Sequence, residues 1–353
     1  MPDPVHPSAD LPGTRLRPAR LRIGWLIGGA LAVVVVAVAG VVIGPVFVSP
    51  AAAIGHLLGF STELSPTEVA ILDQIRLPRV VLGLLVGGTL AVSGAGYQGV
   101  FRNPLADPYL LGAAAGAGLA VTLSIVGRID GGGTVGSAPV AAFVGALAAV
   151  GLTYALGVAG GGRASTSSLI LSGVAVGSFL TAVQTFVQQR HQDTIRQVYS
   201  WILGRLSTAG WHDVLLLLPY AVVSWAVLLT QRRVLDVLAV GDDEAATLGI
   251  NVRRTRLVVI VAASLGTAAA VSVSGLIGFV GIIVPHAVRL LAGRSNRVVL
   301  PLSILFGGAF LCASDLMART IATPDEIPIG VITAFFGAPF FVLILRHSRR
   351  GNS

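Results

Sequence analysis

Side chains that could act in catalysis or bind a metal are scarce in this sequence, and their spacing does not suggest a catalytic centre. Cys312 is the single cysteine, so the chain can form neither an internal disulfide nor a cysteine-rich zinc or iron–sulfur site. All 24 residues counted as Lys or Arg are Arg, and a Walker A loop needs a Lys to reach the nucleotide phosphates. We therefore predict no catalytic residue and no cofactor in this chain, and any nucleotide energy must come from another chain.

Two ionisable residues, Asp315 and His286, lie within apolar segments. Ion-coupled transporters usually need a carboxylate or His relay at such positions. Asp315 precedes Arg319 by four residues, a spacing that favours a local ion pair over a proton relay. His286 follows Pro285 and has no neighbouring His, Cys or carboxylate, so a hydrogen-bonded structural role is favoured over metal ligation. We predict no metal site, and an ion-coupled secondary transporter is the less favoured alternative.

The elements that carry these residues are strongly apolar. Apolar side chains make up 54% of the 353 residues, charged side chains 11%, and the mean hydropathy is +0.85. Soluble domains carry about 25% charged residues, so this composition excludes a soluble enzyme and is typical of a membrane protein. Nine segments without Asp, Glu or Arg approach or exceed the roughly 20 residues of a membrane-spanning helix. They are Ile23–Thr62, Val80–Phe101, Pro108–Gly127, Gly131–Gly162, Ala164–Gln189, Val214–Gln231, Leu257–Val288, Val298–Ser314 and Ile327–Leu345.

The distribution of Arg decides how many helices these segments form. Leu257–Val288 contains a cluster of Ser and Gly residues and is long enough for two helices. Splitting it gives ten helices and places both termini and 17 of the 24 Arg on one side, against 11 without the split. The positive-inside rule therefore favours ten helices with cytoplasmic termini. We predict an all-α polytopic membrane protein with a cytoplasmic tail over 1–22, a transmembrane domain over 23–346 and a second tail over 347–353.

An ordered set of motifs runs through almost the whole chain. The set comprises Arg76-Leu77-Pro78-Arg79, Asn103-Pro104-Leu105-Ala106-Asp107-Pro108, Gly241-Asp242-Asp243-Glu244-Ala245-Ala246-Thr247-Leu248-Gly249, Gly275-Leu276-Ile277-Gly278-Phe279-Val280-Gly281, Pro285-His286 with Arg289, Asp315 with Arg319, and Pro328-Ile329-Gly330. This series resembles the permease subunits of ABC importers for iron–siderophores, haem and cobalamin, the FecCD family. The resemblance covers roughly Ile23 to Arg346 and implies the importer permease fold of that family.

The loop over about 234–252 contains helix formers that end at Gly249, which predicts a short helix outside the bilayer. The acidic residues at its start suit a helix N-terminus. From the residues alone, an ordinary solvated helix is the favoured interpretation. The resemblance instead implies a coupling helix that docks in a groove of the ATP-hydrolysing subunit. The residues assigned to coupling are Gly241, Asp242, Asp243, Glu244, Ala245, Ala246 and Gly249.

Three arginines are expected on the outer side, against the general bias. From the residues alone, Arg76 and Arg79 could simply extend to the interface at a helix end. The resemblance implies that Arg76, Arg79 and Arg319 receive carboxylates from a substrate-binding protein. Guanidinium groups are suited to such bidentate pairing.

The most polar segment, Ala164–Gln189, supplies the candidate residues for the translocation pathway. They are Ser172, Ser178, Thr181, Gln184 and Gln188. The resemblance implies that this helix lines a central passage, while hydrogen bonding between helices is the alternative. Arg205 lies near the expected outer mouth, where it could attract an anionic cargo or pair with Asp213, and we favour the pairing.

The resemblance implies an importer permease that acts as a homodimer or with a paralogue in the cytoplasmic (inner) membrane. Its partners would be two ATPase subunits, which bind ATP and Mg, and a periplasmic or lipid-anchored binding protein. The cargo would be an iron–siderophore, with haem and cobalamin as alternatives. No nucleic-acid partner is expected, because the Arg residues alternate with apolar segments instead of clustering with aromatics.

Overall fold

The computed structural model describes residues 21–44, 46, 48–60, 64–131, 137–159, 165–323 and 325–350. The predicted tail over 1–22 thus lies outside the described residues except for Leu21 and Arg22. Of the tail over 347–353, only the backbone of 347–350 is described, as the end of a helix. All regular secondary structure in the described ranges is helical, which confirms the predicted fold class.

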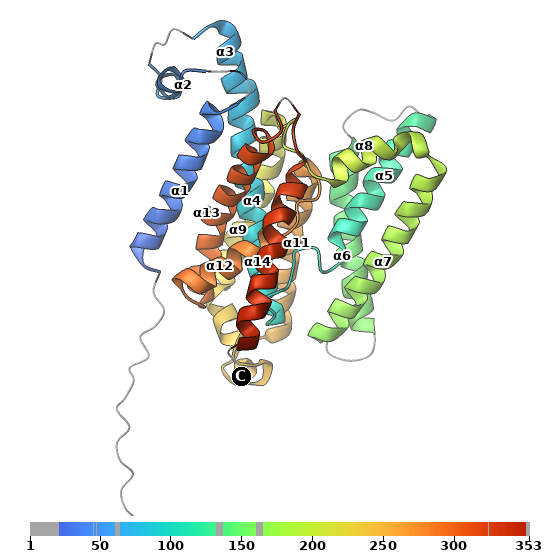
Figure 1. Ribbon diagram of the computed structural model, residues 1–353. Helices are drawn as coiled ribbons and strands as arrows, with labels where there is room; N and C mark the ends of the chain where they lie inside the picture. The colour runs from blue at the N-terminus through green and yellow to red at the C-terminus, as the bar shows by residue number, and fades with distance from the viewer. Residues whose placement is uncertain are drawn as a thin grey trace, which may run out of the picture.

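The helices follow one another with short connections (Figure 1). In chain order they are α1 (Ile23–Val42), α2 (Pro50–Leu57), α3 (Pro66–Ala70), the π-helix η1 (Ile71–Arg76), α4 (Leu77–Phe101), α5 (Ala113–Gly131), α6 (Ser137–Ala159), α7 (Thr166–Arg190), the 3₁₀-helix η2 (Gln192–Thr194), α8 (Ile195–Ile202), α9 (Trp211–Leu238), α10 (Asp242–Thr247), α11 (Val252–Ser274), α12 (Val280–Ala292), α13 (Asn296–Ala318) and α14 (Ile329–Arg350).

Within the described ranges, seven helices are long and apolar enough to cross a membrane. Three shorter apolar helices, over Ala113–Gly127, Val280–Ala292 and Ile329–Phe340, bring the total to ten, the predicted number. The protein is therefore a multi-pass membrane protein.

The long apolar block over Leu257–Val288 is divided in two, as predicted. Helix α11 ends at Ser274, and α12 begins at Val280. Gly275 has a φ of +71°, and a β-carbon there would lie 2.2 Å from the carbonyl oxygen of Trp201. Only glycine fits this close approach, so the chain turns here and the block forms two helices.

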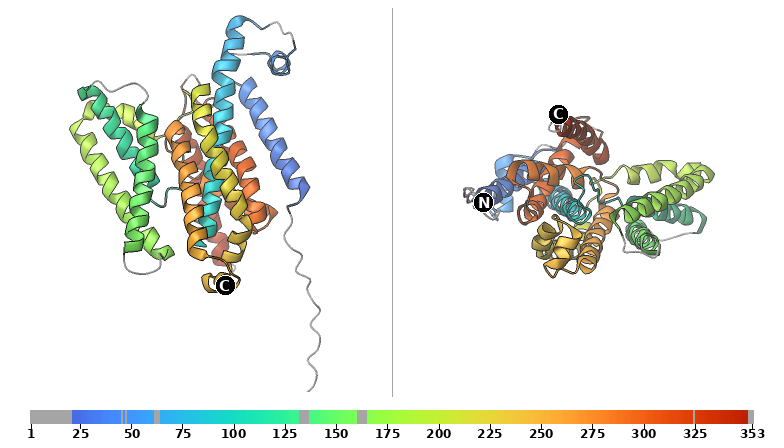
Figure 2. Two further views of the ribbon diagram at one scale, coloured as in Figure 1. Left: turned by 180° about the vertical axis from the view of Figure 1, so that it is seen from behind. Right: turned by 90° about the horizontal axis from the view of Figure 1, so that it is seen from below.

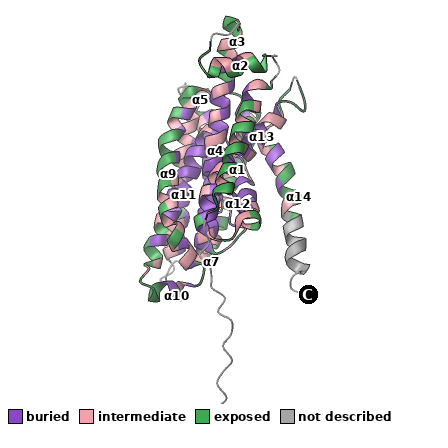
Figure 3. Cartoon of the chain, turned by 90° about the vertical axis from the view of Figure 1, so that its left-hand side faces the viewer, coloured by how far each residue is buried: buried purple, intermediate pink, exposed green. Residues whose placement is uncertain are grey.

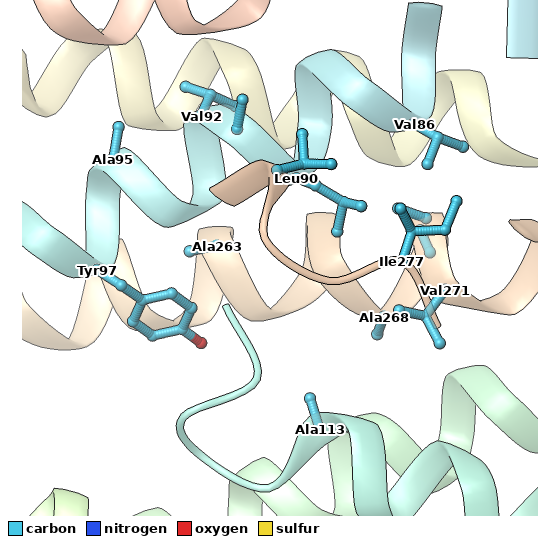
Figure 4. Packing of buried hydrophobic residues seen from close by; sticks show 14 of the residues in the cluster. Val86, Leu90, Val92, Ala95, Tyr97, Ala113, Ala263, Ala268, Val271 and Ile277 are labelled. Carbon is cyan, nitrogen blue, oxygen red and sulfur yellow. The ribbon is translucent and has the colours of Figure 1, made fainter. Parts of the chain in front are cut away.

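Helix α4 forms the centre of the main helical group and packs against α9, α11, α12 and α13. Most of its residues are buried, as the purple colour in Figure 3 shows. A β-carbon on Gly87 would lie 2.3 Å from the carbonyl oxygen of Gly307 in α13, so the two backbones touch. Figure 4 shows Val86, Leu90 and Tyr97 of α4 facing residues of α11. The Tyr97 hydroxyl lies 2.5 Å from Oγ of Ser264.

Helices α5, α6 and α7 form a second group beside the first (Figures 1 and 2). Contacts between α6 and α11 join the two groups. Part of the α7 surface, including Leu171, Val174 and Phe179, has no covering element within the described chain.

The two ends of the molecule carry different elements (Figure 1). Helices α2 and α3 lie at one end, and α10 lies at the other, together with the last residues of α14. Helix α1 also begins toward the α10 end. The α10 end and the α2–α3 end are the two faces that a membrane would separate.

Candidate functional site

Helix α10 is a short helix between α9 and α11, as the sequence predicts. Its end is closed by two backbone hydrogen bonds, from N–H of Gly249 to the carbonyl of Ala246 at 3.0 Å and from N–H of Ile250 to the carbonyl of Ala245 at 3.1 Å. This pattern is a Schellman motif, and it requires the left-handed conformation that Gly249 adopts, with a φ of +81°. The local sequence thus fixes both the length and the exit direction of α10.

Asp242 anchors α10 to the transmembrane helices. Its carboxylate lies 3.5 Å from the guanidinium of Arg102, at the end of α4, and 3.1 Å from that of Arg256 in α11. Ala245, one turn on, is fully buried. A displacement of α10 would therefore be transmitted to α4 and α11 through an ion-paired carboxylate and a packed methyl group. The sequence placed Asp242 in the coupling loop, but it could not identify Arg102 as a partner.

The opposite side of α10 faces outward. Val240 and Leu248 are each 71% exposed, although both are apolar. Exposed residues around them include Asp243, Glu244 and Ala246. We call these five residues the coupling surface. Two exposed apolar side chains beside two carboxylates, outside the spans, are typical of a protein-binding surface.

The residues predicted to act in coupling therefore lie in two different environments. Asp242 and Ala245 contact the membrane domain, while Asp243, Glu244 and Ala246 are exposed, Asp243 and Ala246 beside a cavity that Tyr154 of α6 also lines. Gly241 and Gly249 flank the helix, and the carboxylate end of the Glu244 side chain lies over Gly241. Sequence reasoning missed Val240 and Leu248, although large apolar residues beside an acidic helix outside the spans were a usable signal.

The three arginines predicted to dock a binding protein lie at the other end, and all are turned inward. Arg79 is 7% exposed. Its Nε lies 3.0 Å from Asp315 in α13, and its Nη1 lies 2.8 Å from Glu326 in the loop before α14. Asp315 also lies 3.8 Å from Arg319, the local ion pair that the sequence predicts. The Asp315 carboxylate is thus enclosed by two arginines.

The other two arginines, Arg76 and Arg319, donate hydrogen bonds to carbonyl groups at the end of α1. Arg76 donates to the carbonyls of Val41 at 2.9 Å and Val42 at 2.8 Å, and also to that of Val46. Arg319 donates to the carbonyl of Gly40 at 2.5 Å. With exposures of 3% and 4%, these side chains are held by internal partners. Their guanidinium groups therefore have internal partners, and the docking of a binding protein by Arg76, Arg79 and Arg319 stays a prediction.

The predicted pathway residues of α7 do not share one face. Ser178 and Thr181 are exposed, on the surface that also carries Phe179. Gln184 is buried against α5, where a β-carbon on Gly118 would lie 2.8 Å from its Oε1. Ser172 and Gln188 are half-buried. Ser178 and Thr181 are therefore the most accessible members of the set.

Two expectations about single residues are wrong. Asp213 accepts a hydrogen bond from N–H of Gly210 at 3.0 Å, and the ion pairs among the described residues do not include Arg205 with Asp213. Arg205 instead lines a cavity of about 260 Å³ together with Arg79 and Glu326. Nδ1 of His286 is buried without a hydrogen-bond partner in the described part of the chain, whereas the sequence predicts a hydrogen-bonded ring. The contact between Gly210 and Asp213 is a local capping hydrogen bond, whereas the missing partner of His286 could not be inferred from the spacing.

Comparison with known proteins places this geometry in a family. The model of the FecCD transport family matches residues 31–347. The cobalamin import system permease protein BtuC of Halobacterium salinarum is 48% identical over 302 residues, 84% of this chain and 79% of that protein. The hemin transport system permease protein HmuU of Yersinia pestis is 39% identical, over 79% of this chain and 84% of that protein.

A solved structure supports the same assignment. It is described as an inward-facing conformation of a metal-chelate type ABC transporter, and it superposes with a TM-score of 0.82 at 27% identity. The match covers 92% of this chain and 100% of that one. The family match runs from within α1 to near the end of α14, in line with the ordered motifs of the sequence. The chain belongs to the FecCD transport family.

Proposed function

We propose that this chain is the permease subunit of an ATP-binding-cassette importer for a preformed metal chelate: an iron–siderophore, haem or cobalamin. The observation that carries the proposal is the coupling surface, an exposed docking surface on a helix that is ion-paired to α4 and α11, in a chain of this family. The relatives named above carry cobalamin and hemin in their names, which supports the chelate class.

The energy would come from two partner ATPase subunits that bind ATP and Mg. Each ATPase subunit would bind one coupling surface. A movement of the ATPase subunit would then be transmitted to the spans through Asp242 and Ala245. This assignment places the α10 end in the cytoplasm, in agreement with the 17 Arg expected on that side. The protein would then lie in the cytoplasmic membrane with both termini inside.

A substrate-binding protein would dock at the opposite end, around α2, α3 and the loop before α14. Arg76, Arg79 and Arg319 would stabilise this face through their internal contacts. Arg205 would lie beside them, at the cavity that it lines together with Arg79 and Glu326. A second permease copy or a paralogue would cover the exposed face of α7, which would place Ser178 and Thr181 near the shared passage.

Uptake into proteoliposomes tests the proposal. The permease is reconstituted with its ATPase, and uptake of a ferric siderophore, haem or cobalamin is measured in the presence of the binding protein. We expect uptake of one chelate that requires both the ATPase and ATP. Uptake driven by an ion gradient without the ATPase would support the secondary-transporter alternative instead, against which the pairing of Asp315 with two arginines argues.

A further inference from the structure

A cavity of about 400 Å³ lies at the α10 end, between the last turns of α4 and α12 and the start of α13. Its wall contains three arginines, Arg102, Arg289 and Arg294, together with His286. None of its lining residues is acidic. We call this space the Arg289 cavity. It is separate from the coupling surface, although the pairing of Arg102 with Asp242 places the two close together.

Two of the three arginines of this cavity, Arg289 and Arg294, lack a carboxylate partner among the described residues, whereas Arg102 is ion-paired with Asp242. The Arg289 guanidinium donates to Oε1 of Gln98, which is a neutral amide. Neither Arg289 nor Arg294 takes part in an ion pair with a carboxylate of the described residues. Asp236, next to the cavity wall, already accepts hydrogen bonds from Oγ of Ser295 at 2.6 Å and N–H of Asn296 at 2.5 Å. The nearby acidic side chain is therefore already engaged with other donors.

His286 adds an unsatisfied polar atom to the same wall. Its Nδ1 is buried and has no hydrogen-bond partner within the described part of the chain. The ring is held edge-on against Phe340, with centroids 6.0 Å apart. A buried polar atom without a partner is costly, and this one belongs to a residue that lines the Arg289 cavity.

We propose that the Arg289 cavity binds a phosphate group, with Arg289 and Arg294 as its charged donors. Guanidinium groups match phosphate oxygens in bidentate geometry. The phosphate could belong to the headgroup of an anionic phospholipid or to free inorganic phosphate. Basic pockets between membrane helices recognise phospholipid headgroups, and the position at one end of the helices suits that source. The inference depends on the proposed function only for the leaflet, which would be the cytoplasmic one.

The test uses the purified, delipidated full-length chain in a neutral detergent at constant ionic strength. Binding is measured by thermal protection and by native mass spectrometry. The probes are mixed micelles of dioleoylphosphatidylglycerol, the same micelles with dioleoylphosphatidylcholine, and inorganic phosphate. Protection by phosphatidylglycerol alone would identify a lipid site, and protection by inorganic phosphate as well would identify a general phosphate site. The proposal would be overturned if neither phosphatidylglycerol nor inorganic phosphate protected the protein.

Three variants make the test specific. Arg289→Gln and Arg294→Gln should each weaken binding about tenfold, because each removes a charge-assisted donor. Arg233→Gln removes an exposed charge of α9 outside the cavity lining and should change binding by less than about twofold. If all three variants weakened binding equally, the effect would be one of net charge and the proposal would fail.

Arg294 is exposed, so its variant tests the site even if Arg289→Gln does not fold. No ATPase, chelate or ATP is present in this experiment. A negative result in the binding experiment would therefore not count against the proposed transport function, and an absence of transport would not count against the phosphate site.

Discussion

Single residues in this protein show how ionised groups are accommodated inside an apolar chain. The carboxylate of Asp315 is only 4% exposed, yet it remains compatible with burial because Arg79 and Arg319 enclose it. Glu326 adds a second carboxylate to Arg79, so the charges nearly balance. Such a cluster ties α4, α13 and the loop before α14 together, and its members depend on one another.

The Arg79→Leu substitution tests this dependence. It would leave Asp315 with Arg319 alone and remove the partner of Glu326. Breaking a buried ion pair costs about 3–5 kcal/mol, so we expect the apparent melting temperature in detergent to fall by several degrees. Glu326→Gln is the control, because the Glu326 side chain is 35% exposed and its loss should cost less. Equal melting temperatures for Arg79→Leu and the unmodified protein would contradict this role.

Asp242 is a residue whose loss should affect coupling more than stability. Its side chain is 40% exposed, and exposed ion pairs contribute about 0.2–1 kcal/mol. In Asp242→Asn we expect the ATPase subunit to bind normally, while the stimulation of ATP hydrolysis by the binding protein is lost. Asp243→Asn, on the outward side of α10, should retain stimulation. Full stimulation in Asp242→Asn would exclude a mechanical role for its links to Arg102 and Arg256.

Among the elements, α10 is flanked by two apolar residues, Val240 and Leu248, that are exposed outside the spans. We expect Leu248→Glu to abolish co-purification of the ATPase, since it places a charge at the 71% exposed apolar position of the coupling surface. Thermal stability should change little, because most of the Leu248 side chain is exposed. Leu58→Glu is the matched control, a 67% exposed leucine at the α2–α3 end. ATPase binding that survives Leu248→Glu would exclude this surface as the docking site.

The contact between α4 and α13 depends on the absence of side chains where the two helices cross. Gly87→Ala would place a methyl group 2.3 Å from the Gly307 carbonyl oxygen and force the helices apart. Overpacking of this kind costs about 1–3 kcal/mol. Gly151→Ala in α6 is the control, because a β-carbon there meets nothing within 4 Å. We expect only Gly87→Ala to lower the melting temperature, and an unchanged value would show that the helices can move apart at little cost.

Over the whole molecule, features set by local sequence were predictable and features set by packing were not. The Arg distribution was sufficient to divide Leu257–Val288 into two helices, and Gly249 was sufficient to end α10. In contrast, Arg79 and Asp315 are separated by 236 residues, and nothing in their local sequence pairs them. The inward orientation of Arg76 also arises only once neighbouring elements pack, whereas Asp213 is held locally by N–H of Gly210, three residues before it. The sequence therefore indicated which segments carry the candidate surfaces, but which of their residues are exposed became clear only from the fold.

The orientation of the whole molecule is testable with single engineered thiols. The native Cys312 is 4% exposed and donates to the carbonyl of Val80, so the unmodified protein should not react with a membrane-impermeant maleimide. Thr247→Cys lies at the exposed end of α10, and Thr320→Cys lies exposed at the opposite end of α13. If the α10 end is cytoplasmic, Thr247→Cys will be labelled only in inverted membrane vesicles and Thr320→Cys only in right-side-out vesicles. The reverse pattern would place the coupling surface outside the cell, where no ATPase could reach it, and would therefore contradict both the orientation and the proposed energy source.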